Sequence, residues 1–239
     1  PEVYTAPVEG TEPVNLSYPP LPATSWAVLG MLTLGEELTG NDLKKWADWS
    51  VGLFYWSPSV SQVYGELKKL ETLGLVTSRL VSEPGVRGRR LYTVTPAGID
   101  AVRAWSKGAR VDIPVLKHGV MLRLWLGHLS DPEHLESLVR GHIENMRELR
   151  DRAALNAEHA GREPAWAYGR MSLRWSMRYF DAEIALAEEL FDELREAAEW
   201  YAQGPRDETT GLVGPDDPGS WKTVEDVVDE LLIHDELRG

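Results

Sequence analysis

Three arginines, Arg87, Arg89 and Arg90, lie close together in the stretch GVRGRRLYTVTPAG, residues 85–98. The 239-residue chain has a formal net charge of −13 at pH 7, and a cationic cluster of this density is unusual in so acidic a protein. Guanidinium groups bind phosphate oxygens, and each cation that meets a DNA phosphate releases a condensed counterion. Arginines in a solvated turn give the same local pattern, so the surrounding elements must decide between a DNA contact and a plain surface turn.

The charge of the chain is unevenly distributed. Between Ser25 and Arg110 there are 11 Lys/Arg and 8 Asp/Glu, whereas the rest of the chain holds 14 basic and 30 acidic residues. The arginine cluster therefore lies in a mildly basic segment of an acidic protein. An average charge is a poor guide to binding partners when segments differ in sign.

Several classes of chemistry find no support in the sequence. The absence of cysteine excludes disulfides and thiolate sites, and it favours a reducing compartment. There is no nucleophile elbow, P-loop or dinucleotide fingerprint, so we expect no catalytic residue and no enzyme activity. The six histidines form no i, i+4 pair, so we expect no metal ligands and no cofactor. No long apolar stretch or signal peptide is evident, which predicts a cytoplasmic protein without a membrane partner.

The segment around the arginines has a regular order of predicted elements. Helices are expected over residues 23–34, with Thr24 or Ser25 as cap, after Thr39, and after Ser57 or Ser59 up to Gly74. Residues 75–81 and 90–95 are β-prone runs joined by a turn with Pro and Gly, and Thr95 caps a further helix that begins at Pro96. Three helices followed by a two-stranded wing form the winged variant of the helix-turn-helix.

The third predicted helix has the polarity expected of a recognition helix. Helical spacing places one apolar group on a common arc: Val60, Val63, Tyr64, Leu67 and Leu70. We expect Ser59, Ser61 and Gln62 to face base edges, and Gln62 can pair bidentately with adenine. Glu66 on the exposed arc argues against DNA contact, because a carboxylate repels phosphate. The predicted DNA-binding residues are Thr39, Asn41, Ser59, Ser61, Gln62, Tyr64, Lys68, Lys69, Arg87, Arg89 and Arg90.

The rest of the chain is predicted to support this domain. Residues 1–22 contain six prolines and form a flexible arm, and residues 23–110 form the DNA-binding domain. Residues 111–203 have helical periodicity and are expected to form a dimerisation domain, to which the resemblance given below adds an effector-binding role. Residues 204–239 are expected to be a linker and an acidic terminal helix. The fold class is therefore mainly α, a winged helix followed by a helical dimerisation domain.

Three stretches resemble the winged-helix domain of the PadR family of transcriptional regulators: WAVLGMLTLGEELTGNDLKKW, SQVYGELKKLETLGLV and RGRRLYTVTPAGIDAV. The resemblance covers residues 24–105 and is carried by these positions: Tyr64, Leu67, Leu70, Gly74, Leu75, Tyr92, Thr95 and Gly98. It implies a homodimeric repressor that binds a pseudo-palindromic, double-stranded DNA operator. It also implies that a small phenolic or multidrug-like molecule releases the repressor from DNA.

The ten tryptophans bear on this implied effector. Flat aromatic rings can stack on a planar molecule, and the candidate effector-binding residues are Trp26, Trp125, Trp166 and Trp175. Packing in the core or in a dimer interface explains the same residues and is the favoured interpretation. An alternative function also stays open, in which the winged helix has lost DNA binding and the acidic remainder recruits a protein partner.

Overall fold

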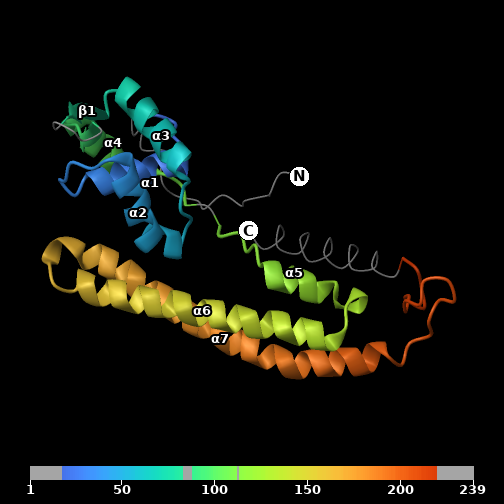
Figure 1. Cartoon of the computed structure of the whole chain (residues 1–239). Coiled ribbons are helices and arrows are strands. Elements are labelled where there is room, and N and C mark those ends of the chain that lie inside the picture. The colour runs from blue at the N-terminus through green and yellow to red at the C-terminus, as the bar shows by residue number, and fades with distance from the viewer. Residues whose placement is uncertain (1–17, 83–87, 112, 220–239) are drawn as a thin grey trace, which may run out of the picture. The chain divides into compact units, whose positions relative to one another are not determined.

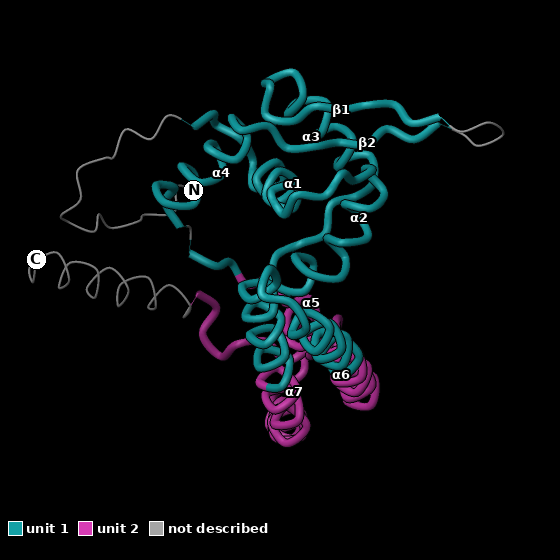
Figure 2. The backbone as a smooth tube through the Cα atoms, turned by 90° about the vertical axis from the view of Figure 1, so that its left-hand side faces the viewer, with its two compact units in different colours: residues 1–115, 147–181 teal, residues 116–146, 182–239 magenta. Residues whose placement is uncertain are grey.

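A computed structural model of the chain describes residues 18–82, 88–111 and 113–219 (Figure 1). The described residues form two compact units, one from residues 18–82, 88–111, 113–115 and 147–181 and the other from 116–146 and 182–219 (Figure 2). The region expected as one helical domain over 111–203 thus contributes to both units. Most of the proline-rich arm, the predicted terminal acidic helix and Arg87 lie outside the described residues.

The first unit contains the predicted winged helix. Its elements are α1 (Ala23–Leu32), α2 (Gly40–Trp49), a 3₁₀ turn η1 (Val51–Leu53), α3 (Val60–Thr72), β1 (Val76–Val81), β2 (Arg89–Val94) and α4 (Pro96–Gly108). The two strands are antiparallel, with Val76 opposite Val94 and Val81 opposite Arg89. They project from the helices of this unit as a ribbon (Figure 2). The mainly helical fold class with a two-stranded wing is confirmed.

Polar caps set where three of these helices begin. Thr39 caps α2 and Ser59 caps α3, each in a capping box in which the third helical residue bonds back to the cap. Thr95 caps α4, and Pro96 follows in the first turn. The predicted cap of the first helix is wrong, because α1 begins after Pro22 without a side-chain cap and Ser25 is buried inside the unit.

The core of the winged helix depends on one face of α3. Val63, Leu67 and Leu70 are fully buried, and they pack in one cluster with residues of α1, α2 and the wing. Burying side chains of this size stabilises a fold by roughly 1.5–3 kcal/mol each. Trp26 of α1 stacks on Trp105 of α4 with ring centroids 5.2 Å apart, which holds α4 against the same core.

The apolar and polar arcs that helical spacing predicts for α3 do not fully match which of its side chains are buried. Val60 and Tyr64 share an arc with the buried Val63, Leu67 and Leu70 but are 43% and 37% exposed, as the prediction of a DNA contact by Tyr64 requires of that residue. The Tyr64 ring lies over Gly40 at the start of α2, where an added Cβ atom would come within 2.6 Å of the ring. Glu66, expected on the exposed arc, is half-buried and accepts a hydrogen bond from the hydroxyl of Ser25.

The first unit also includes residues 147–181, which supply the end of α6 (Pro132–Ala160), the 3₁₀ turn η3 (Pro164–Trp166) and the start of α7 (Ala167–Tyr201). Arg150 and Asp181 form an ion pair of 3.0 Å between the two long helices. The Asn156 side chain donates a hydrogen bond of 2.8 Å to the backbone carbonyl of Trp49. Trp166 meets Trp46 edge to face, at 5.2 Å between ring centroids. The contacts at Trp49 and Trp46 join this part of the chain to α2.

The second unit is built from α5 (Gly119–Trp125), η2 (Gly127–Leu129) and the remaining parts of α6 and α7. Val139, Ile143 and Ala187 form its buried apolar cluster. Beside it, Glu183 contacts the imidazoles of His118 and His142. Burial acts to raise the pKa of Glu183, but hydrogen bonds from the two histidines outweigh it and hold this pKa below its usual value. No helix among the described residues is long and apolar enough to span a membrane.

Gly98 provides a test of how closely α4 packs on the wing. An added Cβ atom there would lie 2.2 Å from the backbone oxygen of Leu75 and 2.8 Å from a methyl group of Val94. We expect Gly98→Ala to lower the free energy of unfolding by about 1–3 kcal/mol, because backbone must shift to relieve the clash. Urea denaturation of the full chain measures this change.

The matched control is Gly65→Ala in α3, where an added Cβ atom meets nothing within 4 Å. This substitution should stabilise the protein by roughly 0.5–1 kcal/mol through helix propensity. Equal effects of the two substitutions would contradict the close packing at Gly98.

Candidate nucleic-acid interface

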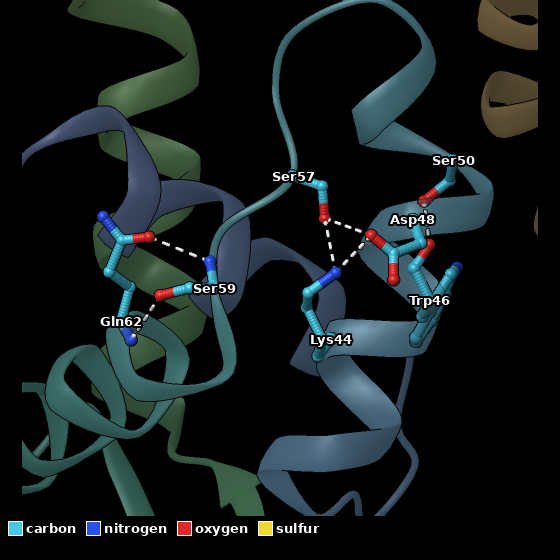
Figure 3. A network of polar contacts seen from close by, with 7 residues as sticks. All are labelled: Lys44, Trp46, Asp48, Ser50, Ser57, Ser59 and Gln62. Atoms are coloured by element: carbon cyan, nitrogen blue, oxygen red, sulfur yellow. Dashed lines mark hydrogen bonds and ion pairs between the residues drawn. The ribbon is translucent and has the colours of Figure 1, made fainter.

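The start of α3 presents the polar residues expected to read DNA. Ser59, Ser61 and Gln62 are all exposed. The Gln62 side-chain oxygen accepts a hydrogen bond of 2.8 Å from the backbone N–H of Ser59, and the Ser59 hydroxyl accepts one from the N–H of Gln62 (Figure 3). The capping box therefore uses one lone pair of the Gln62 oxygen. The amide group of Gln62 keeps two donors and a second lone pair for a base edge.

A polar network holds the loop that leads into α3. Asp48 of α2 accepts a hydrogen bond of 2.6 Å from the hydroxyl of Ser57, and it also pairs with Lys44 one turn earlier (Figure 3). The ammonium group of Lys44 lies 3.3 Å from the same hydroxyl. Hydrogen bonds from Lys44 and Ser57 lower the pKa of Asp48, so the network contains an ionised carboxylate at neutral pH. The loop position before the Ser59 cap is thus fixed from α2.

Of the two predicted contact residues at the start of α2, one is exposed and the other has a structural role. Asn41 is exposed, whereas Thr39 is 9% exposed and its hydroxyl is hydrogen-bonded to Asp42 at 2.7 Å. Hydrogen bonds from Thr39 lower the pKa of Asp42, which keeps the Asp42 carboxylate ionised. Thr39 therefore stabilises the start of α2, and the side chain of Asn41 is accessible there.

Arg89 and Arg90 are the first two residues of β2 in the wing, and both are exposed. Successive residues of a strand point to opposite faces, so the two guanidinium groups leave the ribbon on different sides. Arg90 donates a hydrogen bond of 2.8 Å to the Ser78 hydroxyl of β1. Leu38, just before α2, exchanges backbone hydrogen bonds of 3.1 and 2.9 Å with Tyr92. This bridge sets the position of the wing relative to α2.

The remaining basic side chains differ in whether an acidic side chain pairs with their charge. Lys68 and Lys69 are exposed on the outer side of α3. Arg79 of β1 is paired with Glu37 through two hydrogen bonds, one of them 2.8 Å, and this pairing lowers the pKa of Glu37. Arg79 was not predicted as a contact, and its ion pair leaves it a weaker phosphate ligand than the lysines.

A second feature of the first unit is an aromatic cavity of about 600 Å³. Six aromatic side chains line it: Trp26, Trp46, Trp49, Phe54, Trp166 and Tyr168. Its polar lining consists of neutral residues and one histidine: Thr33, Ser50, Asn156, His159 and Ser172. No Lys, Arg, Asp or Glu is among the described residues that line it. The cavity therefore suits a flat, uncharged molecule.

Two of the four candidate effector residues, Trp26 and Trp166, lie in this cavity. Trp175 stacks on Tyr179 at 5.5 Å and is not part of the lining, and Trp125 belongs to the second unit. The sequence reasoning missed Trp46 and Trp49. Their spacing could have indicated them, because it places two bulky aromatic side chains about one turn apart on the mostly polar helix α2.

The order of elements, the capped polar start of α3 and the cationic wing define a winged-helix protein of the DNA-binding type. Residues 28–104 match the model of the transcriptional regulator PadR-like family. Residues 28–104 are thus a PadR-like domain, and the resemblance noted in the sequence is confirmed.

The relatives agree with this assignment. The negative transcriptional regulator PadR of Bacillus subtilis (strain 168) is 36% identical over 80 residues, which are 34% of this chain and 43% of that protein. The match thus spans less than half of the curated relative. The crystal structure of Bacillus subtilis PadR in complex with operator DNA matches with a TM-score of 0.62 and 20% identity, covering 72% of this chain and 99% of that one. Its structure with p-coumaric acid matches with a TM-score of 0.55 and 20% identity, covering 72% and 98%. These structural matches establish a shared fold.

The hydrogen bond from Ser25 to Glu66 offers a test of what fixes α3 against α1. We expect Ser25→Ala to lower the free energy of unfolding by about 1–2 kcal/mol, because a half-buried carboxylate loses a charge-assisted bond. A double-mutant cycle with Glu66→Ala, measured by chemical denaturation, isolates the pair. Strictly additive effects of the two substitutions would show that this bond contributes nothing to stability.

Proposed function

We propose that this protein is a homodimeric, sequence-specific DNA-binding repressor that a small aromatic ligand releases from its operator. The observation that carries the DNA-binding part is the exposed polar start of α3, which lies in a PadR-like domain together with Asn41 and the wing arginines. Arrangements of this type place the start of the recognition helix in the major groove and the wing against the backbone. The operator complex of Bacillus subtilis PadR supports this assignment by family analogy.

Each group has a distinct task in this proposal. Ser61 and Gln62 read base edges, with Gln62 directed at adenine. Lys68 and Lys69 bind phosphates along the outer side of α3. Arg89 binds phosphate or enters the minor groove, where cations are favoured by the negative potential. Arg87 has the same proposed role, but it lies outside the described residues.

The surroundings of Glu66 remove one argument for a protein-interaction module. That alternative drew support from a carboxylate on the face of α3 that should meet DNA. Glu66 instead bonds to Ser25 of α1, so its charge is turned toward the inside of the first unit. We therefore favour DNA as the partner of this face.

The homodimer is supported by an exposed apolar surface of the second unit. Leu122 and Trp125 of α5 and Leu129 of η2 are 60–77% exposed. A cluster of large exposed apolar side chains is a common mark of a subunit interface. A twofold dimer then requires a pseudo-palindromic operator with half-sites about 34–36 Å apart, or a multiple of that distance.

Electrophoretic retardation of the DNA beside the gene of this protein tests the DNA-binding proposal. Retardation at about 50 mM salt should weaken steeply as salt increases, because bound phosphates release counterions. Replacing both Arg89 and Arg90 with Ala should reduce the slope of log K against log salt by about 2.

The matched control is Arg103→Ala in α4, which removes an exposed arginine paired with Asp100. Its slope should equal that of the unmodified protein. A slope that does not change in the wing variant would exclude phosphate contacts by these two arginines, and the absence of any retarded fragment would refute the proposed function.

The aromatic cavity is the proposed effector site, and its lining defines the ligand. An anionic carboxylate in a cavity lined by no Lys or Arg loses hydration without gaining a cationic partner. The structure of Bacillus subtilis PadR with p-coumaric acid shows that a related fold accepts an aromatic acid. For this protein we propose instead a neutral planar aromatic molecule.

Comparing p-coumaric acid with its methyl ester tests this ligand class. We expect the ester to bind at least about tenfold more tightly, because its carbonyl group is neutral. Quenching of tryptophan fluorescence measures binding, and release of operator DNA measures the response. Trp166→Ala should weaken ester binding, whereas Trp175→Ala, which lies outside the cavity, should not. Tighter binding of the acid would contradict the proposed ligand chemistry.

A further inference from the structure

Three side chains from separate segments of the chain converge in the second unit. His118 precedes α5, His142 lies on α6 and Glu183 lies on α7. One carboxylate oxygen of Glu183 lies 2.5 Å from Nε2 of His118 and 3.1 Å from Nε2 of His142. The two imidazole rings have centroids 4.9 Å apart and are tilted by 54°. All three helices run beside one another in this unit (Figure 1).

The cluster is mostly buried but keeps some contact with solvent. The side chains of His118, His142 and Glu183 are 15%, 12% and 13% exposed. Next to them on α6 and α7, Ile143 and Ile184 belong to the apolar cluster of the unit. An apolar surrounding strengthens the interaction between a charged ligand atom and a cation, because little water competes there. The residual exposure leaves a path for an ion or a water molecule.

The donor atoms fit a transition-metal ion. Two imidazole nitrogens and one carboxylate oxygen are zinc ligands, at distances of roughly 2.0–2.2 Å. In a tetrahedron of that size, ligand atoms lie about 3.3 Å apart. Ligand atoms of the three side chains all lie within 4.8 Å of one another, and two of the separations are 2.5 and 3.1 Å. These separations differ from about 3.3 Å by roughly 1.5 Å at most, so small side-chain shifts would produce the required geometry.

We propose that His118, His142 and Glu183 bind one divalent transition-metal ion, with zinc as the best match to the donor set. Calcium and magnesium prefer oxygen ligands, so two imidazoles select against them. Three protein ligands leave a fourth position for water or an exogenous ligand. An ion bound there links α5 to both long helices of the second unit.

The protonation of His118 gives this proposal a specific signature. Nδ1 of His118 accepts a hydrogen bond of 3.1 Å from the backbone N–H of Met121, so the neutral ring carries its proton on Nε2. A metal ion at Nε2 displaces that proton, and a neutral ring then holds its proton on Nδ1. The bond from Met121 must break, which is a small cost beside two imidazole ligands and a carboxylate ligand. The Met121 amide therefore reports on metal binding.

Metal titration of the full chain, without a histidine tag and after treatment with chelator, tests the site. We expect one zinc ion per chain by elemental analysis, and a tetrahedral visible spectrum when cobalt(II) replaces zinc. Glu183→Gln preserves shape and hydrogen bonding but removes the charge, and it should weaken zinc binding by at least about 100-fold. His142→Asn should have a similar effect.

The matched control is His134→Ala, which removes an exposed histidine of α6 outside the cluster. Zinc affinity should not change in this variant. Nuclear magnetic resonance of the unmodified chain should show a large shift of the Met121 amide on zinc addition, a readout that needs no variant to fold. No zinc uptake by the unmodified chain, or equal affinity in Glu183→Gln, would overturn the proposal. These measurements involve neither DNA nor the aromatic ligand, so they are independent of the proposed function.

Discussion

The burial of Val63, Leu67 and Leu70 is the constraint on which the winged helix depends. These fully buried side chains anchor one face of α3 and contribute roughly 1.5–3 kcal/mol each, so the helix cannot rotate about its axis without exposing them. The opposite face is then exposed by default, and the polar capping box at Ser59 and Gln62 lies at its start. The proposed DNA interface is thus a consequence of core packing rather than a separate structure.

The order of elements could be predicted from the sequence because its signals are local. The caps at Thr39, Ser59 and Thr95 are each followed within three residues by their partners, and the strands are short β-prone runs. The errors concern neighbours distant in the chain. A helical wheel placed Tyr64 on the apolar arc and Glu66 on the polar arc of α3, whereas their actual environments depend on the close approach of α2 at Gly40 and on Ser25 of α1.

The histidine–glutamate cluster and the aromatic cavity are even harder to predict from sequence, because their residues are distant from one another in the chain. His118 and His142 lie 24 positions apart, and Glu183 follows 41 positions after His142, so no local motif unites them. The abundance of tryptophan indicated aromatic binding, but composition does not say which rings converge. Trp26 and Trp166 meet in one cavity only because the ends of α6 and α7 belong to the first unit. Such sites require tertiary structure for their detection.

The position of the aromatic cavity bears on how a ligand would affect DNA binding. Trp46 and Trp49 of α2 line the cavity together with Ser50, which directly follows this helix. On the same helix, Asp48 holds Ser57, two residues before the cap of α3 (Figure 3). A ligand changes DNA affinity only as far as it binds two arrangements of this segment with different free energies. For a tenfold change that difference is about 1.4 kcal/mol, which is comparable to one or two net hydrogen bonds. The small network around Asp48 is therefore of the right energetic size to couple the cavity to α3.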